Sequence, residues 1–212
     1  MTHPSDGDLL ESFRAGDGAA FGALVERHQA ALLRHARAIL GTGSAYEDVV
    51  QEVFLRLAQT PPVLPELARG DAELERLHLA GWLHKVTRNA CMDTIRSEAR
   101  RRRREDEVST DGVAPRSHDG VAAVEEDDTR EVVARGLERL PADQREVLVL
   151  RLLGERSYKE IAEITGKKIG TVGWLVSVGL KALAKELGPL IEGGAGQGSA
   201  RVRLDVVRGE TR

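Results

Sequence analysis

Basic and amide side chains recur along residues 81–104 at spacings that would place them on one face of a helix. The apolar stripe consists of Leu83, Val86, Ala90 and Ile95 with Cys91 beside them, and the basic stripe of Lys85, Arg88, Arg96, Arg100 and Arg103. Trp82 and Asn89 add an aromatic ring and a planar amide near the start of the segment. A basic helix that carries an aromatic ring is typical of a nucleic-acid site, although by composition alone a solvated surface helix fits equally well.

The composition favours an all-α protein built on aliphatic side chains. The chain has 212 residues, which leaves room for one or two small domains. Hydrophobic residues make up 41% of the chain but aromatic residues only 3%, so Leu, Val, Ala and Ile must fill the core, as in helix bundles. The net charge of −3 hides a dipolar layout, because the arginines are clustered.

Several classes of protein are disfavoured by what the sequence lacks. No apolar run approaches the roughly 20 residues of a membrane span, and no secretory signal is visible. The single cysteine, Cys91, rules out an internal disulfide framework and fits a reducing cytosol. No metal-ligand spacing, glycine-rich phosphate loop or nucleophile elbow is present. We therefore expect a cytoplasmic protein that is not an enzyme and needs neither a metal nor a cofactor.

Three helices are expected before the basic segment, over Asp8–Arg14, Ala19–Leu40 and Ser44–Gln59. Ser44 and Glu47 form a capping-box pattern, which predicts the start of the third helix. That helix carries an acidic and amide patch away from its apolar stripe, made of Asp48, Gln51 and Glu52. Taken singly, most such patches are ordinary solvated faces.

The segment Thr60–Leu79 connects this third helix to the basic one. Three prolines forbid a continuous helix at its start, and Gly70 interrupts the mixed helical character of its second half. A connection of this length is unusual in a helix bundle, and long ordered connections are often functional.

Charge and glycine mark the expected domain boundaries. Residues 105–128 hold nine acidic side chains and one Arg, without a periodic apolar stripe, which is typical of a flexible linker. We therefore expect two small helical domains, at residues 1–104 and 129–192, joined by this acidic linker and followed by a flexible tail at 193–212.

The second domain carries a helix–turn–helix pattern. Ser157 and Glu160 form a capping box that opens one helix, and a last helix is expected from Gly170 to Leu187. Ala162 would let the two helices approach closely, and Gly166 would allow the left-handed turn between them. The bare spacing also fits an ordinary helical hairpin, but the caps and the glycine turn favour a DNA-binding motif.

At these residues the sequence resembles the sigma factors of bacterial RNA polymerase. The segment YEDVVQEVF at 46–54, followed by GWL at 81–83 and Arg88-Asn89, is similar to sigma-70 region 2. The segments Leu140-Pro141, QREV at 144–147, SYKEIA at 157–162 and GTV at 170–172 are similar to region 4. Having only these two regions is the layout of the extracytoplasmic-function (ECF) group, and the resemblance covers roughly residues 8–187.

The resemblance implies a sigma factor that binds core RNA polymerase and promoter DNA and is controlled by an anti-sigma factor or other regulator. It implies core polymerase binding by Asp48, Gln51, Glu52 and Phe54. For the −10 promoter element it implies Trp82, Lys85, Arg88, Asn89, Arg96 and Arg100, and for the −35 element Ser157, Lys159, Lys167, Lys168, Thr171 and Trp174. The acidic linker would run through the active-site channel of the polymerase.

Two segments depart from the family pattern. The short Phe-Arg-Gly loop that commonly precedes Trp82 in the family is replaced by Thr60–Leu79, which has no aromatic residue. The last helix lacks cations in its middle and carries Trp174 and several aliphatic residues nearly all round. One hypothesis is that it contacts the −35 element weakly and packs on protein. The alternative is that it is rotated, with Trp174 buried in the core.

Two other functions remain open at this point. A free-standing helix–turn–helix regulator would bind duplex DNA without polymerase, but it would leave the acidic patch and the acidic linker without a role. A sigma-like interaction module that has lost −35 binding would fit the neutral last helix.

Overall fold

The structure is a computed structural model that describes residues 4–41, 43, 45–108, 133 and 136–193. For residues 105–108 and 188–193, at the ends of two helices, only the backbone is described. Every regular element in these ranges is a helix, which confirms the all-α prediction. The elements are α1 (Asp6–Arg14), α2 (Gly18–Leu40), α3 (Ala45–Gln59), η1 (Glu66–Ala68), α4 (Ala72–Val108), α6 (Ala142–Leu148), η2 (Val149–Leu153), α7 (Tyr158–Thr165) and α8 (Ile169–Gly193). Ser44, the acidic stretch from 109 to 132 and the tail from 194 onward lie outside the described residues.

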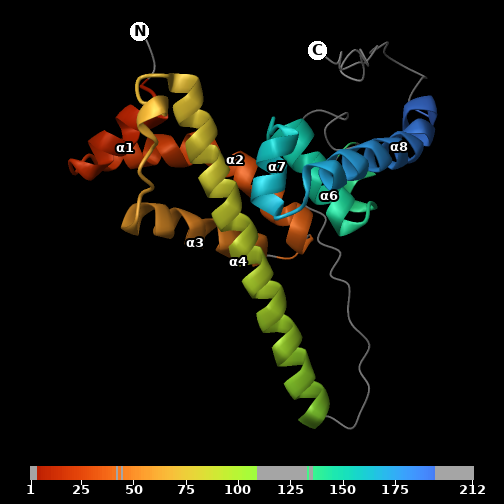
Figure 1. Cartoon of the computed structure of the whole chain (residues 1–212). Helices are drawn as coiled ribbons and strands as arrows, with labels where there is room; N and C mark the ends of the chain where they lie inside the picture. The colour runs from red at the N-terminus through yellow and green to blue at the C-terminus, as the bar shows by residue number, and fades with distance from the viewer. Residues whose placement is uncertain (1–3, 42, 44, 109–132, 134–135, 194–212) are drawn as a thin grey trace.

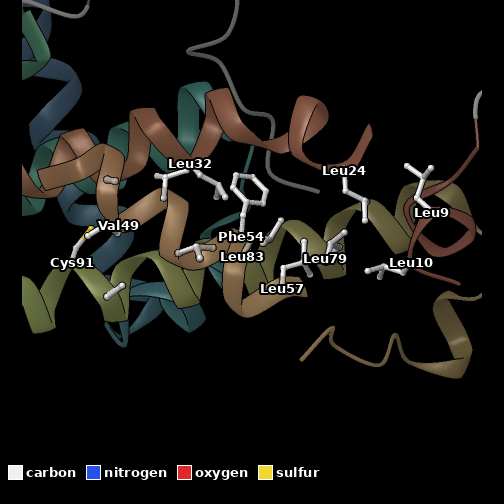
Figure 2. Close-up of a cluster of buried hydrophobic side chains, with 14 of the residues drawn as sticks. Leu9, Leu10, Leu24, Leu32, Val49, Phe54, Leu57, Leu79, Leu83 and Cys91 are labelled. Atoms are coloured by element: carbon white, nitrogen blue, oxygen red, sulfur yellow. The ribbon is translucent and has the colours of Figure 1, made fainter. Parts of the chain in front are cut away.

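The N-terminal helices, α1 to α4, enclose a first hydrophobic core (Figure 2). Ser5 caps α1 through a capping box with Asp8, so this helix begins at Asp6, slightly before the expected Asp8. The buried side chains of this core are aliphatic apart from Phe54 and Cys91, as the low aromatic content requires. It includes Leu9, Leu10, Leu24, Leu32, Val49, Phe54, Leu57, Leu79, Leu83 and Cys91.

The helix α4 is longer than expected, because it begins at Ala72 rather than Gly81 and ends at Val108 rather than Arg104. The side chain of Asp71 accepts hydrogen bonds from the backbone N–H groups of Glu73 and Leu74, at 3.0 Å each, and so caps the helix. Gly70, at φ +82°, makes the turn before that cap. The second half of the long connection is therefore the first turns of α4.

The C-terminal helices, α6, η2, α7 and α8, form a second hydrophobic core. The chain passes from α6 into η2, a π-helical segment that ends at Gly154. The expected capping box of Ser157 and Glu160 begins α7. Gly166 ends it, and the backbone of Gly166 is in the left-handed conformation at φ +70°. The expected helix–turn–helix is present, and α8 begins at Ile169.

The two sets of helices pack against each other across α4 and α2. In Figure 1, α1 and α3 lie on one side of α4 and the C-terminal helices lie on the other, while the far end of α4 projects alone. The contacts join α4 to α7, and α2 to α6 and η2. Within the described residues, no helix is long and apolar enough to cross a membrane.

The thiol of Cys91 should be unreactive in the folded protein. Its side chain is fully buried in the first core, and burial raises the pKa of Cys91 to about 12. Because the thiolate is the reactive form, labelling with a thiol reagent at pH 8 should be slow in buffer and complete in denaturant. Rapid labelling of the native protein would contradict the position of Cys91 in the core.

Candidate functional site

Four exposed side chains form a stripe along α3. Asp48, Gln51 and Glu52 are exposed to solvent, as their helical spacing predicted. Leu55 continues the same stripe and is 60% exposed. An ion pair between Glu52 and Arg56 orders one edge of the stripe. An exposed leucine beside two acids and an amide is a surface that fits another protein. Leu55 follows Gln51 by four residues and Glu52 by three, and this helical spacing would have placed Leu55 in the stripe. It was not among the residues predicted from the sequence.

Phe54 does not belong to this stripe. At about 100° per residue, it lies about 160° around the helix from Glu52 and about 60° from Gln51, at the border of the apolar side. The structure buries its ring in the first core, at 8% exposed. Its place in the core indicates a role in holding α3, and its expected part in polymerase binding stays a prediction.

A basic face follows one side of α4. Lys85, Asn89, Arg96 and Arg100 are all exposed, and their spacing places them within about 60° of one another around the helix. Arg96 also pairs with Asp93 at 3.0 Å, but both side chains are more than half exposed. Such a pair contributes little, so Arg96 stays available to an anion.

Trp82 and Arg88 differ from these four residues. The Trp82 ring is half-buried and packs on the first core, so only part of it is exposed. The Nε atom of Arg88 donates a hydrogen bond of 2.9 Å to Oε1 of Glu146, on the C-terminal helix α6. The structure therefore places Arg88 at a contact between the two sets of helices.

Polar contacts hold the start of α7 and the turn between α7 and α8. The hydroxyl of Ser157 accepts from the backbone N–H of Glu160, which fixes Ser157 as a cap. The ammonium group of Lys167 pairs with Asp143 of α6 at 3.0 Å. Of the residues predicted for the −35 element, these two therefore have structural contacts, while Lys159, Lys168 and Thr171 are exposed.

The start of α8 presents an apolar surface. Trp174 is 61% exposed and Ile169 is 54% exposed, with Tyr158 of α7 nearby at 41%. The guanidinium of Arg151 lies 5.4 Å from the centre of the Tyr158 ring. The alternative that buries Trp174 in the core is therefore wrong, and Leu175 and Val176 take that position instead.

Four buried polar groups between the two cores were not found from the sequence: Glu146, His35, His84 and Arg156. The Nδ1 atoms of His35 and His84 lie 3.1 Å apart, and Nε2 of His35 lies 3.6 Å from Oε1 of Glu146. Burial, and then the neighbouring His35 and Arg156, lower the pKa of His84 well below its usual value. The His84 ring therefore stays neutral and can share one proton with His35.

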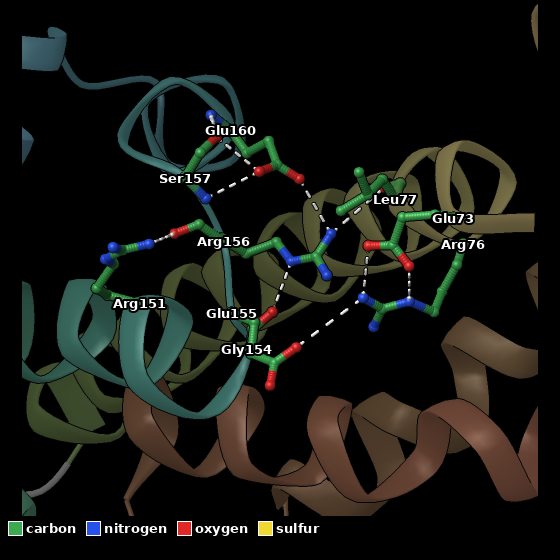
Figure 3. A network of polar contacts seen from close by, with 9 residues as sticks. All are labelled: Glu73, Arg76, Leu77, Arg151, Gly154, Glu155, Arg156, Ser157 and Glu160. Carbon is green, nitrogen blue, oxygen red and sulfur yellow. Dashed lines mark hydrogen bonds and ion pairs between the residues drawn. The ribbon is translucent and has the colours of Figure 1, made fainter. Parts of the chain in front are cut away.

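Arg156 joins the loop before α7 to both sets of helices (Figure 3). Its guanidinium donates to the carbonyls of Gly154 at 2.6 Å and Leu77 at 3.4 Å, and pairs with Glu160 at 3.0 Å. It is only 2% exposed, so these partners replace its lost hydration. A charged residue just after Gly154 gave no sign of this burial in the sequence.

The described residues contain no group of three or more His, Cys, Asp or Glu side chains that could hold a metal ion. What they place on the surface is a polar and leucine stripe, a basic helix face and a helix–turn–helix.

Known protein families and relatives match the chain along most of its length. Residues 24–66 match the Sigma-70 region 2 family and residues 130–183 match the Sigma-70 region 4 family. The chain is 32% identical over 189 residues to the ECF RNA polymerase sigma factor SigM of Mycobacterium tuberculosis, covering 89% of this chain and 88% of SigM. It is 27% identical over 197 residues to the ECF RNA polymerase sigma-E factor of Escherichia coli K12, covering 88% and 96%.

Among solved structures, the chain resembles the sigma factor RpoE in its complex with the anti-sigma factor NepR from Bartonella quintana. The TM-score is 0.57 at 25% identity, over 79% of this chain and 96% of that one. The two family regions, the long match to SigM and this shared fold all point the same way. The chain belongs to the ECF RNA polymerase sigma factors.

Proposed function

We propose that the chain binds core RNA polymerase through the stripe of Asp48, Gln51, Glu52 and Leu55 on α3. The observation that carries this proposal is the exposure of all four side chains on one side of a helix whose other side fills the first core. The first core needs none of them, so their types are free to suit a partner. A leucine flanked by acids fits a basic protein surface with an apolar hollow.

The basic face of α4 is proposed to hold the −10 element. Lys85, Arg96 and Arg100 supply cations for phosphates, and Asn89 supplies an amide for a base edge. The half-buried Trp82 can offer a ring edge or face to one unpaired base while its other side packs on the core. Arg88 joins this set once it is released from Glu146.

The helix–turn–helix is proposed to contact the −35 element weakly. Exposed Lys159 and Lys168 can hold phosphates near the turn. The major groove, however, offers mostly polar edges, which suit the exposed Trp174 and Ile169 poorly. This apolar surface favours a protein partner, and the solved RpoE structure, which contains an anti-sigma factor, supports a regulator of that kind.

The proposed function also covers the compartment, the absence of catalysis and the acidic linker. The chain acts in the cytoplasm by binding and catalyses no reaction of its own. The acidic linker expected at residues 105–128, of which the structure places 105–108 in α4, is proposed to run through the active-site channel of the polymerase. The domain bounds expected from the sequence stay a prediction.

Transcription in vitro with core polymerase tests the function directly. On a library of random promoters, initiation should depend on this chain, and sequencing the active templates should show a preferred −10 element with a weak preference at −35. A strong −35 preference, one in which scrambling that element costs tenfold or more (about 1.4 kcal/mol), would contradict the weak contact. Template binding without initiation would instead indicate a free-standing DNA-binding regulator.

A further inference from the structure

The contact between the two sets of helices is built on one buried carboxylate. Glu146 of α6 is 3% exposed, and it accepts a hydrogen bond of 2.9 Å from Arg88. His35, on α2, also approaches it, at 3.6 Å. Arg88 belongs to the N-terminal helices, so the contact itself supplies the positive charge that compensates Glu146. Separation of the two sets would return this carboxylate to water.

Further polar groups cross the contact. Arg145 donates to the backbone carbonyl of Ala38 at 2.6 Å, and Arg37 pairs with Glu138. Among the described residues, Ala38 is the N-terminal side chain that enters the second core. A cavity of about 100 Å³, lined by groups from both sets, remains between them. An interface of this kind can separate, since domain motion is opposed mainly by large hydrophobic contacts.

The basic face of α4 depends on whether this contact is closed. A guanidinium that donates to Glu146 has its Nε–H group occupied, and the carboxylate cancels much of its charge. The side chain of Arg88 is only 20% exposed in this state, and the C-terminal helices cover its end. A DNA phosphate and Glu146 therefore compete for the same group.

We propose that the contact of Arg88 with Glu146 is an autoinhibitory latch that keeps Arg88 from promoter DNA until the C-terminal helices move away. The proposal rests on the proposed role of the α4 face. The C-terminal helices cover the Arg88 position of that face, while Lys85, Asn89, Arg96 and Arg100 stay exposed. Contact of Arg88 with DNA and its contact with Glu146 exclude each other, so each weakens the other by the same factor.

The full-length chain with two labels tests the latch. Cysteines introduced at the exposed Glu98 on α4 and Lys181 on α8 report the distance between the two sets, because Cys91 is buried. The variant Glu146→Gln, which keeps the shape and removes the charge, should shift the distance distribution to longer values. The matched control Glu163→Gln, at an exposed acid of α7, should leave the distribution unchanged.

Binding of a fluorescent single-stranded DNA oligonucleotide gives the second measurement. Glu146→Gln should bind it roughly tenfold more tightly than the parent, since closure lowers the competent fraction. Arg88→Ala should also lengthen the distance, but it should weaken DNA binding. The exchange Arg88→Glu with Glu146→Arg should restore the short distance.

Two outcomes would overturn the latch. The first is an unchanged distance both in Glu146→Gln and in Arg37→Glu. The second variant places a like charge opposite Glu138 at an exposed ion pair of the same contact, away from both cores. The second is a longer distance with unchanged DNA affinity. If Arg88→Ala then also binds DNA normally, the failure lies in the proposed role of Arg88 on DNA. If only Arg88→Ala loses affinity, that role holds and the latch alone is wrong.

Discussion

The double substitution Asp48→Lys with Glu52→Lys will abolish co-purification of the chain with core RNA polymerase and leave its helix content unchanged. Both side chains are exposed on α3, so their replacement disturbs no core packing. Like charges brought together at an interface cost several kcal/mol. The affinity should therefore fall by at least about a hundredfold, which corresponds to about 2.8 kcal/mol.

The matched control is Glu11→Lys with Glu26→Lys, which makes the same change of charge at exposed positions of α1 and α2. This control should bind core polymerase as the parent does. Measured affinities that drop equally in both variants would reflect net charge rather than the stripe. Normal binding by the α3 variant would place the polymerase contact elsewhere.

Replacement of Arg156 by Met should destabilise the protein by about 3 kcal/mol, because loss of one partner strands the other groups of a buried network. Glu160 would lose its guanidinium partner, and the carbonyls of Gly154 and Leu77 would lose their donor. The stem of Met keeps most of the apolar contact. The melting temperature should fall by roughly 6–12 °C, at 2–4 °C per kcal/mol for a chain of this size.

Arg139→Met provides the comparison, since Arg139 pairs with Glu186 while two-thirds exposed. An exposed pair is worth about 0–1 kcal/mol, so this variant should melt close to the parent. A small effect at Arg156 would mean that its burial does not stabilise the loop before α7.

The helices and the turn were predictable because their signals are local. Ser157 and Glu160 are three residues apart, and Gly166 marks a left-handed turn, so periodicity and caps find them. The start of α4 was missed although its signal is equally local. Asp71 is a good N-cap, and acidic residues follow it in the first turn, six to ten residues after the three prolines that end the preceding helix.

The contact between the two cores could not be predicted in the same way. Arg88 and Glu146 are 58 residues apart, and no helical period relates them. A hint exists at Glu146, a charged residue next to the apolar run of Val147, Leu148 and Leu150. A charged residue beside a buried apolar stripe indicates that its side chain has an ion-pair partner. Only the tertiary structure shows that this partner is Arg88.

The far end of α4 is an arginine-rich arm that projects from the other helices. The helix has 37 residues, which makes it about 55 Å long, and residues 95–104 are all exposed in the part that projects in Figure 1. These last turns are held by their own backbone hydrogen bonds, while the five arginines from 100 to 104 repel one another. At 0.1 M salt the screening length is about 10 Å, so neighbouring arginines are only partly screened from one another and added salt weakens their repulsion further. We therefore expect the helix content of this arm to rise with ionic strength, and a polyanion laid along it to stabilise its last turns.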